Sequence, residues 1–317
     1  MKILLIFIII TGYTIARAQD MQVFDQYFPE HEILNPALTG YENCYSISLH
    51  DHHQWLGMKT SPNTQTIFAR GRFSFPRAAS YHGLGLMVTR DQNGSFRNLE
   101  ADVLYAYHVR LSDAKKTYMS LGLSAVVSQV TLDESGFNNF NNDPVISGAR
   151  LSVWNPDLSL GVVVYNKTYY AGVSAFNLLP VLSFLTNPVA ADKNQRIFVA
   201  VAGIKMNPRK SDIEFEPSVV LHYLESLYSR MDINLKGYYR QTIWLGVSLR
   251  KYLVDDLTSN LSALPSVGIT VGNFEIAYSY GFGFSSIHRR SYGSHFLMLR
   301  WKLCQENRDI LPCPAYN

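Results

Sequence analysis

Two short groups of polar residues could carry chemistry. The run His50–His53 contains three histidines and an aspartate, which are metal-ligand types, and Ser294 next to His295 could be read as a nucleophile and its base. Neighbouring residues on a strand point to opposite faces. Ser294 and His295 therefore cannot form a catalytic pair by themselves. His50 and His52 would share one face while Asp51 and His53 point the other way, and two histidines without a third ligand are better explained as a polar strand end.

The usual catalytic motifs are missing from the sequence. It contains no Gly-x-Ser-x-Gly elbow, no Walker-type phosphate loop and no His-Glu-x-x-His metal helix. The pair of glycines in Gly83-Leu84-Gly85 lies within an expected strand, where it indicates close packing or a bend rather than nucleotide binding. We therefore expect no enzymatic activity, no cofactor and no metal site.

The three cysteines are Cys44, Cys304 and Cys313. They are too few and too scattered for a disulfide-rich scaffold or a cysteine-based zinc site. Cys304 and Cys313 could form a disulfide in an oxidising periplasm and close a small loop near the C-terminus. Free or partly buried thiols are an equally good interpretation.

The composition sets the class of protein that must position these residues. The chain has 317 residues, of which 17% are charged, 47% hydrophobic and 13% aromatic. Charge at this level is below the roughly 25% usual for soluble domains, which argues against disorder and coiled coils. The formal net charge of +3 falls to about +1 once Lys2 and Arg17 are removed with a leader. A net charge this small does not indicate binding to nucleic acid.

The first residues resemble a secretory signal peptide. Lys2 gives a short positive region, an apolar run covers Ile3–Ile10, and Ala16-Arg17-Ala18 forms an Ala-x-Ala cleavage site. The apolar run is too short to cross a bilayer as a helix, which needs about 20 residues. We expect a signal peptide at residues 1–18, with the mature chain beginning at Gln19.

Apolar and polar residues alternate along most of the remaining chain, which is the pattern of β-strands. Between Thr242 and Arg250, for example, Leu245 and Val247 fall on one face and Ser248 on the other. Such segments predict about fourteen strands, at residues 44–54, 64–75, 82–90, 99–111, 117–130, 154–165, 168–176, 195–206, 213–224, 229–237, 241–251, 264–272, 274–282 and 293–303.

The connections between these strands alternate in length, with exceptions at 76–81 and 225–228. Connections after even-numbered strands are mostly short. Those after odd-numbered strands are mostly long, at residues 55–63, 91–98, 131–153, 177–194, 252–263 and 283–292. This sidedness is typical of an up-and-down barrel with long extracellular loops and short periplasmic turns.

We therefore predict an all-β, transmembrane antiparallel β-barrel in the outer membrane, formed by residues 44–303. It would follow an N-terminal periplasmic segment at residues 19–43 and precede a C-terminal tail at 304–317. A soluble β-sandwich or propeller is the alternative. Sandwiches do not need so many similar strands with sided connections, and no repeat of constant period marks propeller blades.

Several blocks of sequence resemble one family. Gln19, Asp20, Phe24, Gln26, Tyr27 and Phe28 precede Leu34-Asn35-Pro36-Ala37 and Gly40, and a second block reads Gln54-Trp55-x-Gly57 with Ser61-Pro62-x-Thr64. Further matching blocks include Gly83-x-Gly85, Asn155-Pro156-Asp157, Trp244-x-Gly246 and Gly293-Ser294-His295. Together these blocks are similar to the PorP/SprF family of Bacteroidetes outer-membrane proteins, over almost the whole mature chain.

Two of these blocks also have a simple structural interpretation. Asn35 followed by Pro36 is a turn signal, because proline fixes φ and disfavours helix in the residue before it, and it would form an elbow below the first strand. Trp55 could belong to an aromatic belt while Gly57 turns the chain. A contact between the motif residues Gln54, Trp55 and Gly57 and a partner protein is the functional alternative.

The resemblance implies a role in the type IX secretion system and the associated gliding machinery. It points first to a noncatalytic barrel that binds and helps export or anchor a cell-surface adhesin through the adhesin's C-terminal domain. Other type IX secretion components and outer-membrane lipid are the further expected partners. A core machine component that links the outer membrane to the periplasmic ring is the runner-up. A passive porin or transporter remains as a different class.

The long connections would form the partner surface. The segment in the 177–194 connection is unusually apolar for a loop, so that it either covers the barrel mouth or contacts a partner. The partner-binding candidates in this segment are Leu178, Leu179, Val181, Leu182, Phe184 and Leu185.

Overall fold

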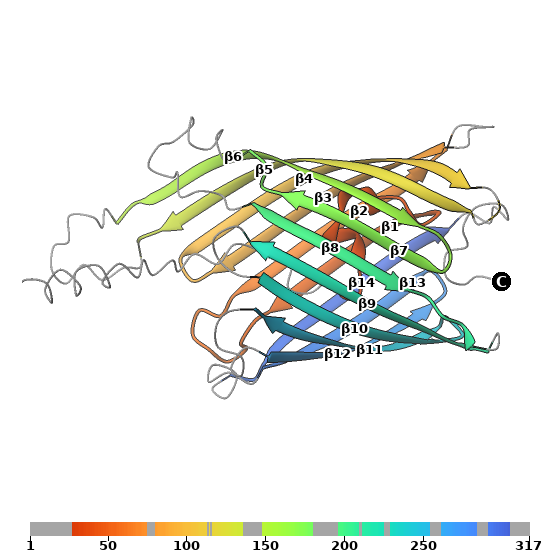
Figure 1. Ribbon diagram of the computed structural model, residues 1–317. Helices are drawn as coiled ribbons and strands as arrows, with labels where there is room; N and C mark the ends of the chain where they lie inside the picture. Colours follow the sequence, from red (N-terminus) through yellow and green to blue (C-terminus); the bar gives the residue numbers. More distant parts are fainter. Residues whose placement is uncertain are drawn as a thin grey trace, which may run out of the picture.

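The computed structural model is a closed antiparallel β-barrel of fourteen strands (Figure 1). It describes residues 27–74, 80–112, 114, 116–135, 148–179, 196–208, 211–224, 229–253, 261–283 and 291–304. The strands are β1 (Cys44–His53), β2 (Asn63–Phe73), β3 (Ser80–Asn93), β4 (Phe96–Ser112), β5 (Thr117–Asp133), β6 (Arg150–Tyr165), β7 (Tyr169–Phe176), β8 (Ile197–Ile204), β9 (Ile213–Leu224), β10 (Ser229–Tyr239), β11 (Ile243–Tyr252), β12 (Leu261–Val271), β13 (Phe274–Gly283) and β14 (Ser294–Cys304). The fold class predicted from the sequence is confirmed.

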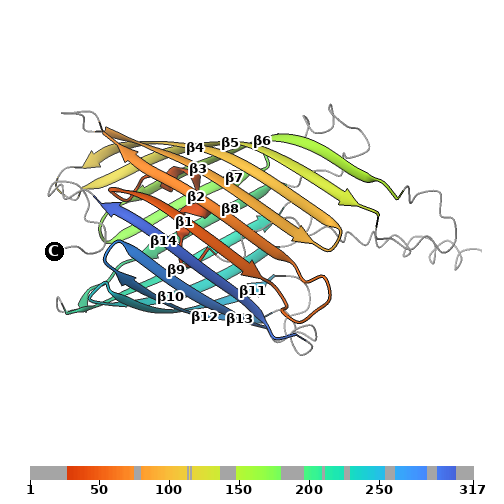
Figure 2. The ribbon, with the colours of Figure 1, turned by 180° about the vertical axis from the view of Figure 1, so that it is seen from behind.

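Each strand pairs with its neighbours in the chain, and β1 pairs with β14 to close the ring (Figure 2). The closure register runs from Cys44 opposite Cys304 to His53 opposite His295. A closed ring leaves no strand edge unpaired, as a lipid environment demands. Among the described residues, no helix has the length and apolar character to span a bilayer.

The largest difference from the sequence prediction lies between β3 and β4. Residues 91–98 were expected to form a long loop, but the two strands continue to Asn93 and from Phe96, and only Gly94 and Ser95 connect them. Gly94 has a φ of 61°, which suits a tight turn. Polar side chains in this segment suggested a loop, but backbone pairing beyond the apolar belt does not require apolar side chains.

The two ends of the barrel differ in their connections. At one end, which we call the long-connection rim, the structure describes residues 54–62, the tight β3–β4 turn, and the parts 134–135, 148–149, 177–179, 196, 253 and 291–293 of four longer connections. At the other end, the short-turn rim, lie the turns at residues 166–168, 240–242 and 272–273 and residues 205–208 and 211–212 of the longer β8–β9 connection.

The alternation of faces follows the sequence pattern. Leu245 is 63% exposed on the outer face of β11, whereas Ser248 is 2% exposed on the inner face. On the other strands too, most large apolar side chains lie outside and most small or charged side chains lie inside. The outer wall is therefore apolar and the lumen polar, which is the arrangement of an outer-membrane barrel.

This arrangement predicts a depth-dependent cost for charge on the outer face. Ile233 lies at the middle of β10 and is 49% exposed. We expect Ile233→Arg to destabilise the folded barrel by about 2–4 kcal/mol, because the guanidinium would enter the centre of the apolar belt. Tyr239→Arg at the end of the same strand should cost about 0–1 kcal/mol. Chemical denaturation in lipid vesicles measures both, and equal costs would contradict the assigned face or depth.

Residues 27–43 fill part of the lumen, and we call this segment the plug. It contains two short 3₁₀ helices, η1 (His31–Leu34) and η2 (Pro36–Leu38), the second of which packs against β4, β5 and β6 (Figure 1, dark red). The sequence suggested a periplasmic segment at residues 19–43. Residues 27–43 lie inside the barrel instead, and residues 19–26, the leader and the tail beyond Cys304 are outside the described residues.

The plug crosses much of the lumen. The Tyr27 hydroxyl donates to Asp232 Oδ2 at 2.8 Å, close to where β10 leaves the long-connection rim. At its other end the plug leads into Cys44, the first residue of β1, at the short-turn rim. Its buried apolar side chains include Tyr27 and Leu34, which pack on β8 and β9. Apolar contacts inside a polar lumen therefore account for part of its position.

Candidate functional site: the plugged lumen

Glycines in the barrel wall make room for the plug. A Cβ atom at Gly83 of β3 would overlap the carbonyl group of Thr39, and one at Gly122 of β5 would overlap the backbone of Ala37. The close packing expected at Gly83 is thus confirmed. Any side chain at these positions would force the plug or the wall to move, because neither clash is with the flexible end of a side chain.

Asn35 fixes the plug to the wall by two hydrogen bonds and makes a third within the plug. Its Nδ2 donates to the carbonyl oxygens of Val162 in β6 and Val173 in β7 at 3.2 and 3.1 Å, and its Oδ1 accepts from the Ala37 N–H at 2.9 Å. Pro36 occupies the first position of η2, where its missing N–H costs nothing. The motif residues Asn35 and Pro36 therefore form a buried anchor inside the barrel, not an elbow below the first strand.

A buried charge cluster joins the plug to β1, β2 and β14. Glu30 contacts the Arg70 guanidinium, its Oε2 lies 2.6 Å from His50 Nε2, and it also accepts from the Ser48 hydroxyl at 2.9 Å. Glu32 contacts Arg70 as well. Burial opposes ionisation of Glu30, but Arg70 and His50 hold the pKa of this carboxyl well below its usual range. The plug is thus held by charge pairs shielded from water.

A second group of charges lies on β13 and β14. Arg300 Nη2 and Lys302 Nζ lie 2.5 and 2.9 Å from Glu275 Oε2, and the Trp244 Nε1–H donates to Glu275 Oε1 at 3.1 Å. Arg300 also reaches Glu30 at 3.6 Å. The two groups therefore form one network across the plug–wall boundary.

The histidine run is divided between the two faces, as its spacing predicts. His50 and His52 are buried in the lumen, while His53 pairs with Asp51 at 3.0 Å on the other face. In the part of the chain that the structure describes, no group of three or more His, Cys, Asp or Glu side chains is arranged to hold a metal ion. His50 instead pairs with Glu30 of the plug.

Ser294 and His295 have separate partners. The Ser294 hydroxyl oxygen accepts from the Trp55 N–H at 3.3 Å, and His295 Nδ1 hydrogen-bonds the Tyr278 hydroxyl at 2.7 Å. Ser294 faces the lumen and His295 the outside. The two side chains do not form a nucleophile and base.

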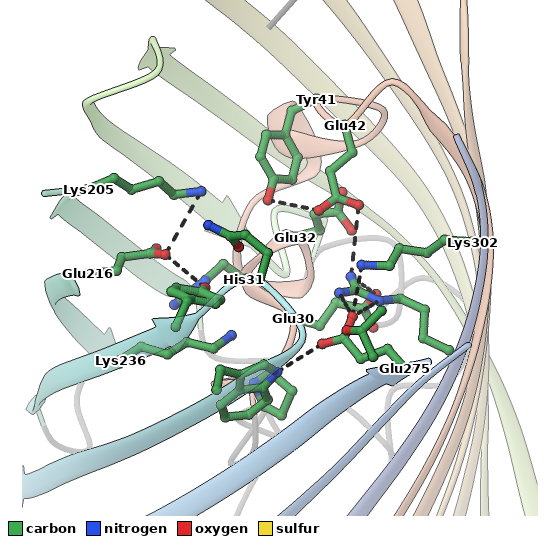
Figure 3. A pocket seen from close by; sticks show the side chains of 16 residues that line it. Glu30, His31, Glu32, Tyr41, Glu42, Lys205, Glu216, Lys236, Glu275 and Lys302 are labelled. Carbon is green, nitrogen blue, oxygen red and sulfur yellow. Dashed lines mark hydrogen bonds and ion pairs between the residues drawn. The ribbon is translucent and has the colours of Figure 1, made fainter. Parts of the chain in front are cut away.

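A polar pocket lies between the plug and the wall (Figure 3). From the plug, His31, Glu32 and Glu42 line it, and Lys236 and Glu216 face them from β10 and β9. Burial lowers the pKa of His31 to about 4, so that its imidazole is neutral at pH 7. The pocket thus combines carboxylates and cations at close range, an arrangement that holds the plug electrostatically.

Lys236 also connects the plug to the wall through aromatic rings. Its Nζ lies 3.9 Å from the ring centre of Trp244, 5.1 Å from that of Tyr238 and 5.7 Å from that of Phe28. Phe28 belongs to the plug, so that its ring completes a cage around the ammonium group. This contact adds a second kind of attraction at the same boundary.

A disulfide joins Cys44 to Cys304. The pairing of Cys304 with Cys313, one of the alternatives left by the sequence, is therefore wrong. Barrel closure explains the difference, because it places the first residue of β1 opposite the last residue of β14. Cys304 ends a strand rather than beginning the tail, and Cys313 lies outside the described residues.

We expect Cys304→Ser to destabilise the barrel by about 2–4 kcal/mol, because the disulfide closes a loop across the whole barrel. The heat-induced mobility shift in gels should then occur at a lower temperature, as it should for wild type under reductant. Cys313→Ser is the control and should behave like wild type. A non-reduced peptide joining Cys304 to Cys313 in mass spectra would refute the pairing.

The second motif lies at the long-connection rim, away from Asn35 and Pro36. There the Gln54 N–H donates to the Pro62 carbonyl at 2.9 Å, and Gly57 adopts a φ of 90° against the ring of Tyr292. Trp55 contacts Ser294 as described above. The motif blocks at 54–57 and 293–295 therefore hold two neighbouring connections together. Glycine is needed at position 57 because φ is positive there and the Tyr292 ring leaves no room for a side chain.

Only part of the partner-binding candidate segment lies within the described residues. The Leu178 N–H donates to the Leu158 carbonyl at 3.1 Å, and the Leu179 N–H donates to Asp157 Oδ1 at 2.9 Å. Both leucines are half-buried at the start of the β7–β8 connection. The other candidates lie outside the described residues: Val181, Leu182, Phe184 and Leu185.

Sequence reasoning missed the charge network. Arg70, Glu275 and Arg300 lie on strands in which apolar and polar residues alternate, and each occupies an inward position. This position was the only feature of the sequence that could have indicated a role in the lumen. Their partners in the plug are far away in the sequence.

Comparisons with known proteins agree with the fold. A family model described as type IX secretion system membrane protein PorP/SprF matches residues 16–301. Among solved structures, the chain is similar to the CymD monoaromatic hydrocarbon channel, with 10% identity, a TM-score of 0.51 and coverage of 87% of this chain and 93% of that one. It is also similar to Omp33 of Acinetobacter baumannii, with 6% identity, a TM-score of 0.46 and coverage of 83% and 99%. At these identities the likeness concerns the fold alone. No curated protein matches the chain.

Proposed function

The chain belongs to the PorP/SprF family of type IX secretion system membrane proteins, and on this premise we propose that it binds a cell-surface adhesin and helps to export or anchor it. It acts as a noncatalytic outer-membrane barrel that recognises the C-terminal domain of the adhesin. The family is one of type IX secretion system membrane proteins, and the barrel fold is similar to that of a hydrocarbon channel.

The plug is the observation that carries this proposal. Residues 27–43 occupy the lumen and are held there by hydrogen bonds, charge pairs and glycine contacts. A passive porin needs an open water-filled channel. A lumen partly filled by a plug instead favours a barrel that works through its rims and offers surfaces to other proteins.

The long-connection rim supplies the proposed contact surface. Leu178 and Leu179 are apolar residues at this rim, in a connection that is fairly poor in charge. Apolar groups at such a place favour a lasting protein contact over exposure to water. Their backbones are tied to Leu158 and Asp157, so that the start of the connection has a defined position.

We expect Leu178→Asp together with Leu179→Asp to leave the barrel in the outer membrane but to release the adhesin into the medium or block its export. The added charges disrupt the apolar contact, while the backbone hydrogen bonds of both residues remain. Adhesin on cells and in the medium is measured by immunoblot, and the barrel by its heat-modifiable mobility. Leu253→Asp is the matched control, because this exposed leucine also lies at the long-connection rim.

The same strain separates the proposal from its runner-up. Affinity purification of the wild-type barrel should recover an adhesin. If it recovers periplasmic ring components and never an adhesin, the protein is a core machine component. Normal adhesin attachment in the double-aspartate variant would reject Leu178 and Leu179 as the contact.

A further inference from the structure

An acidic cluster lies on the inner wall of β4 and β6, in the part of these strands toward the long-connection rim. Its members are Glu100 and Asp102 of β4 and Asn155 and Asp157 of β6. Asp102, Asn155 and Asp157 are all buried. Asn155 and Asp157 belong to one motif block, and neither the plug nor the proposed partner contact explains the buried side chain of Asn155.

The strand register brings these four side chains together. They form two rows across three neighbouring strands: Glu100, Ser128 and Asn155 in one row, and Asp102, Val126 and Asp157 in the next. Because paired strands lie about 4.8 Å apart, the members on β4 and β6 are roughly 10 Å apart at the backbone. The central strand between them carries only a serine and a valine at this level.

The carboxyl groups of this cluster have no basic partner in the described part of the chain. Asp102 accepts only from the Ser124 hydroxyl, at 3.3 Å, and Asp157 accepts the N–H groups of Leu158 and Leu179. No ion pair joins Glu100, Asp102 or Asp157 to a described lysine or arginine. The plug acids Glu30 and Glu32, in contrast, contact arginine directly.

Two oxygen atoms of the cluster are buried without any hydrogen bond. They are Asp102 Oδ2 and Asn155 Oδ1, and the Asn155 side chain belongs to a residue that is only 8% exposed. A buried acceptor without a donor is destabilising, because it has given up its hydrogen bonds to water without replacing them. The asparagine oxygen is an observation independent of the carboxylates, and it calls for the same kind of partner, a hydrogen-bond donor.

The missing partner must carry positive charge and several donors. The described His, Cys, Asp and Glu residues form no group suited to a metal ion. A guanidinium or ammonium group fits better, because it offers several N–H donors that can reach oxygens spread over two strands.

We propose that the acidic cluster binds a guanidinium or ammonium group carried by a basic side chain of the secreted partner. The source of that group rests on the proposed function, whereas the site itself does not. Asp157 also holds the N–H of Leu179, so that the cluster adjoins the start of the proposed contact surface.

A tethered cation tests the site without any ligand. In Ser128→Lys the ammonium would extend between Glu100 and Asn155, whereas Ser128→Gln provides a side chain of comparable reach without the charge. We expect the lysine variant to unfold at a higher temperature than the glutamine variant. Equal unfolding temperatures, or a lower one for lysine, would overturn the proposal.

Binding of a small probe tests the chemistry directly. Ethylguanidinium is titrated into the purified full-length barrel by calorimetry, with ethylurea as its neutral analogue. We expect binding of the cation only, at least tenfold weaker in Glu100→Gln and Asp102→Asn and unchanged in Asp212→Asn, an acid at the opposite rim. Ser128→Lys should block binding. Equal binding by all variants would refute the site, and calcium binding that displaces the probe would assign the site to a metal ion.

Cells that express the Ser128 variants test the source of the cation. We expect Ser128→Lys to lose adhesin from the surface and Ser128→Gln to retain it. If both retain it while the double-aspartate variant at Leu178 and Leu179 loses it, the basic side chain of the partner is rejected and the proposed function stands. If adhesin never depends on the barrel at all, the proposed function fails, and the probe titration still decides whether the cluster binds cations.

Discussion

Replacing Arg70 by methionine is expected to destabilise the folded barrel by about 3–5 kcal/mol. The Arg70 side chain is 2% exposed and contacts both Glu30 and Glu32, whose side chains are 1% and 3% exposed. Methionine keeps much of the apolar volume but leaves two buried acids without their main counterion. Removing one partner of a buried ion pair costs this much because the remaining charge is neither hydrated nor paired.

Guanidinium denaturation in detergent or vesicles measures this loss, and the heat-modifiable mobility should shift at a lower temperature. Arg240→Met is the matched control, because Arg240 pairs with Asp212 at 2.9 Å at the short-turn rim, where both side chains are more than half exposed. Ion pairs between exposed side chains contribute little to the stability of the folded protein. Similar losses in both variants would show that the Glu30–Arg70 contact is not a buried pair that holds the plug.

Gly122→Ala is expected to loosen the plug and let ions through the barrel. The new methyl group would overlap the backbone of Ala37 in η2, which has no flexible end to turn aside. Overpacking of this kind costs about 1–3 kcal/mol. The loss falls on the plug rather than on the strands, since the clash is with the plug.

Single-channel recording in planar bilayers measures the second effect. Wild type should be nearly silent, and the alanine variant should show repeated openings. Gly237→Ala is the control, because the nearest atoms to its added Cβ are ordinary contacts at 3.6 Å. A silent alanine variant with unchanged stability would mean that the plug does not depend on this close approach.

The strands could be predicted from the sequence because the alternation of apolar and polar residues is visible within each strand separately. Leu245 is apolar and lies on the outer face, whereas Ser248 is polar and lies on the inner face. The same relation between polarity and face holds for most residues of the other strands. The long hairpin of β3 and β4 was missed because its ends lie beyond the apolar belt, where side-chain polarity no longer reports strand structure.

The candidate site was predicted only in part, and the reason is distance along the chain. Asn35 was singled out by a motif, but its partners Val162 and Val173 are unremarkable strand residues that accept through their backbones. Glu30 contacts Arg70, but in the sequence neither residue differs from an ordinary charged surface residue. Only closure of the barrel brings these groups together.

The position of the plug sets an order for biogenesis. The plug precedes β1 in the chain and lies within the ring that β1 and β14 complete. An already sealed cylinder would have to be threaded by residues 27–43, whereas a curved, open sheet can wrap around them. The assembly machinery must therefore receive the plug before it joins the first and last strands. Cys44 and Cys304 meet only when β1 and β14 have paired. Formation of their disulfide therefore reports that the barrel has closed around the plug.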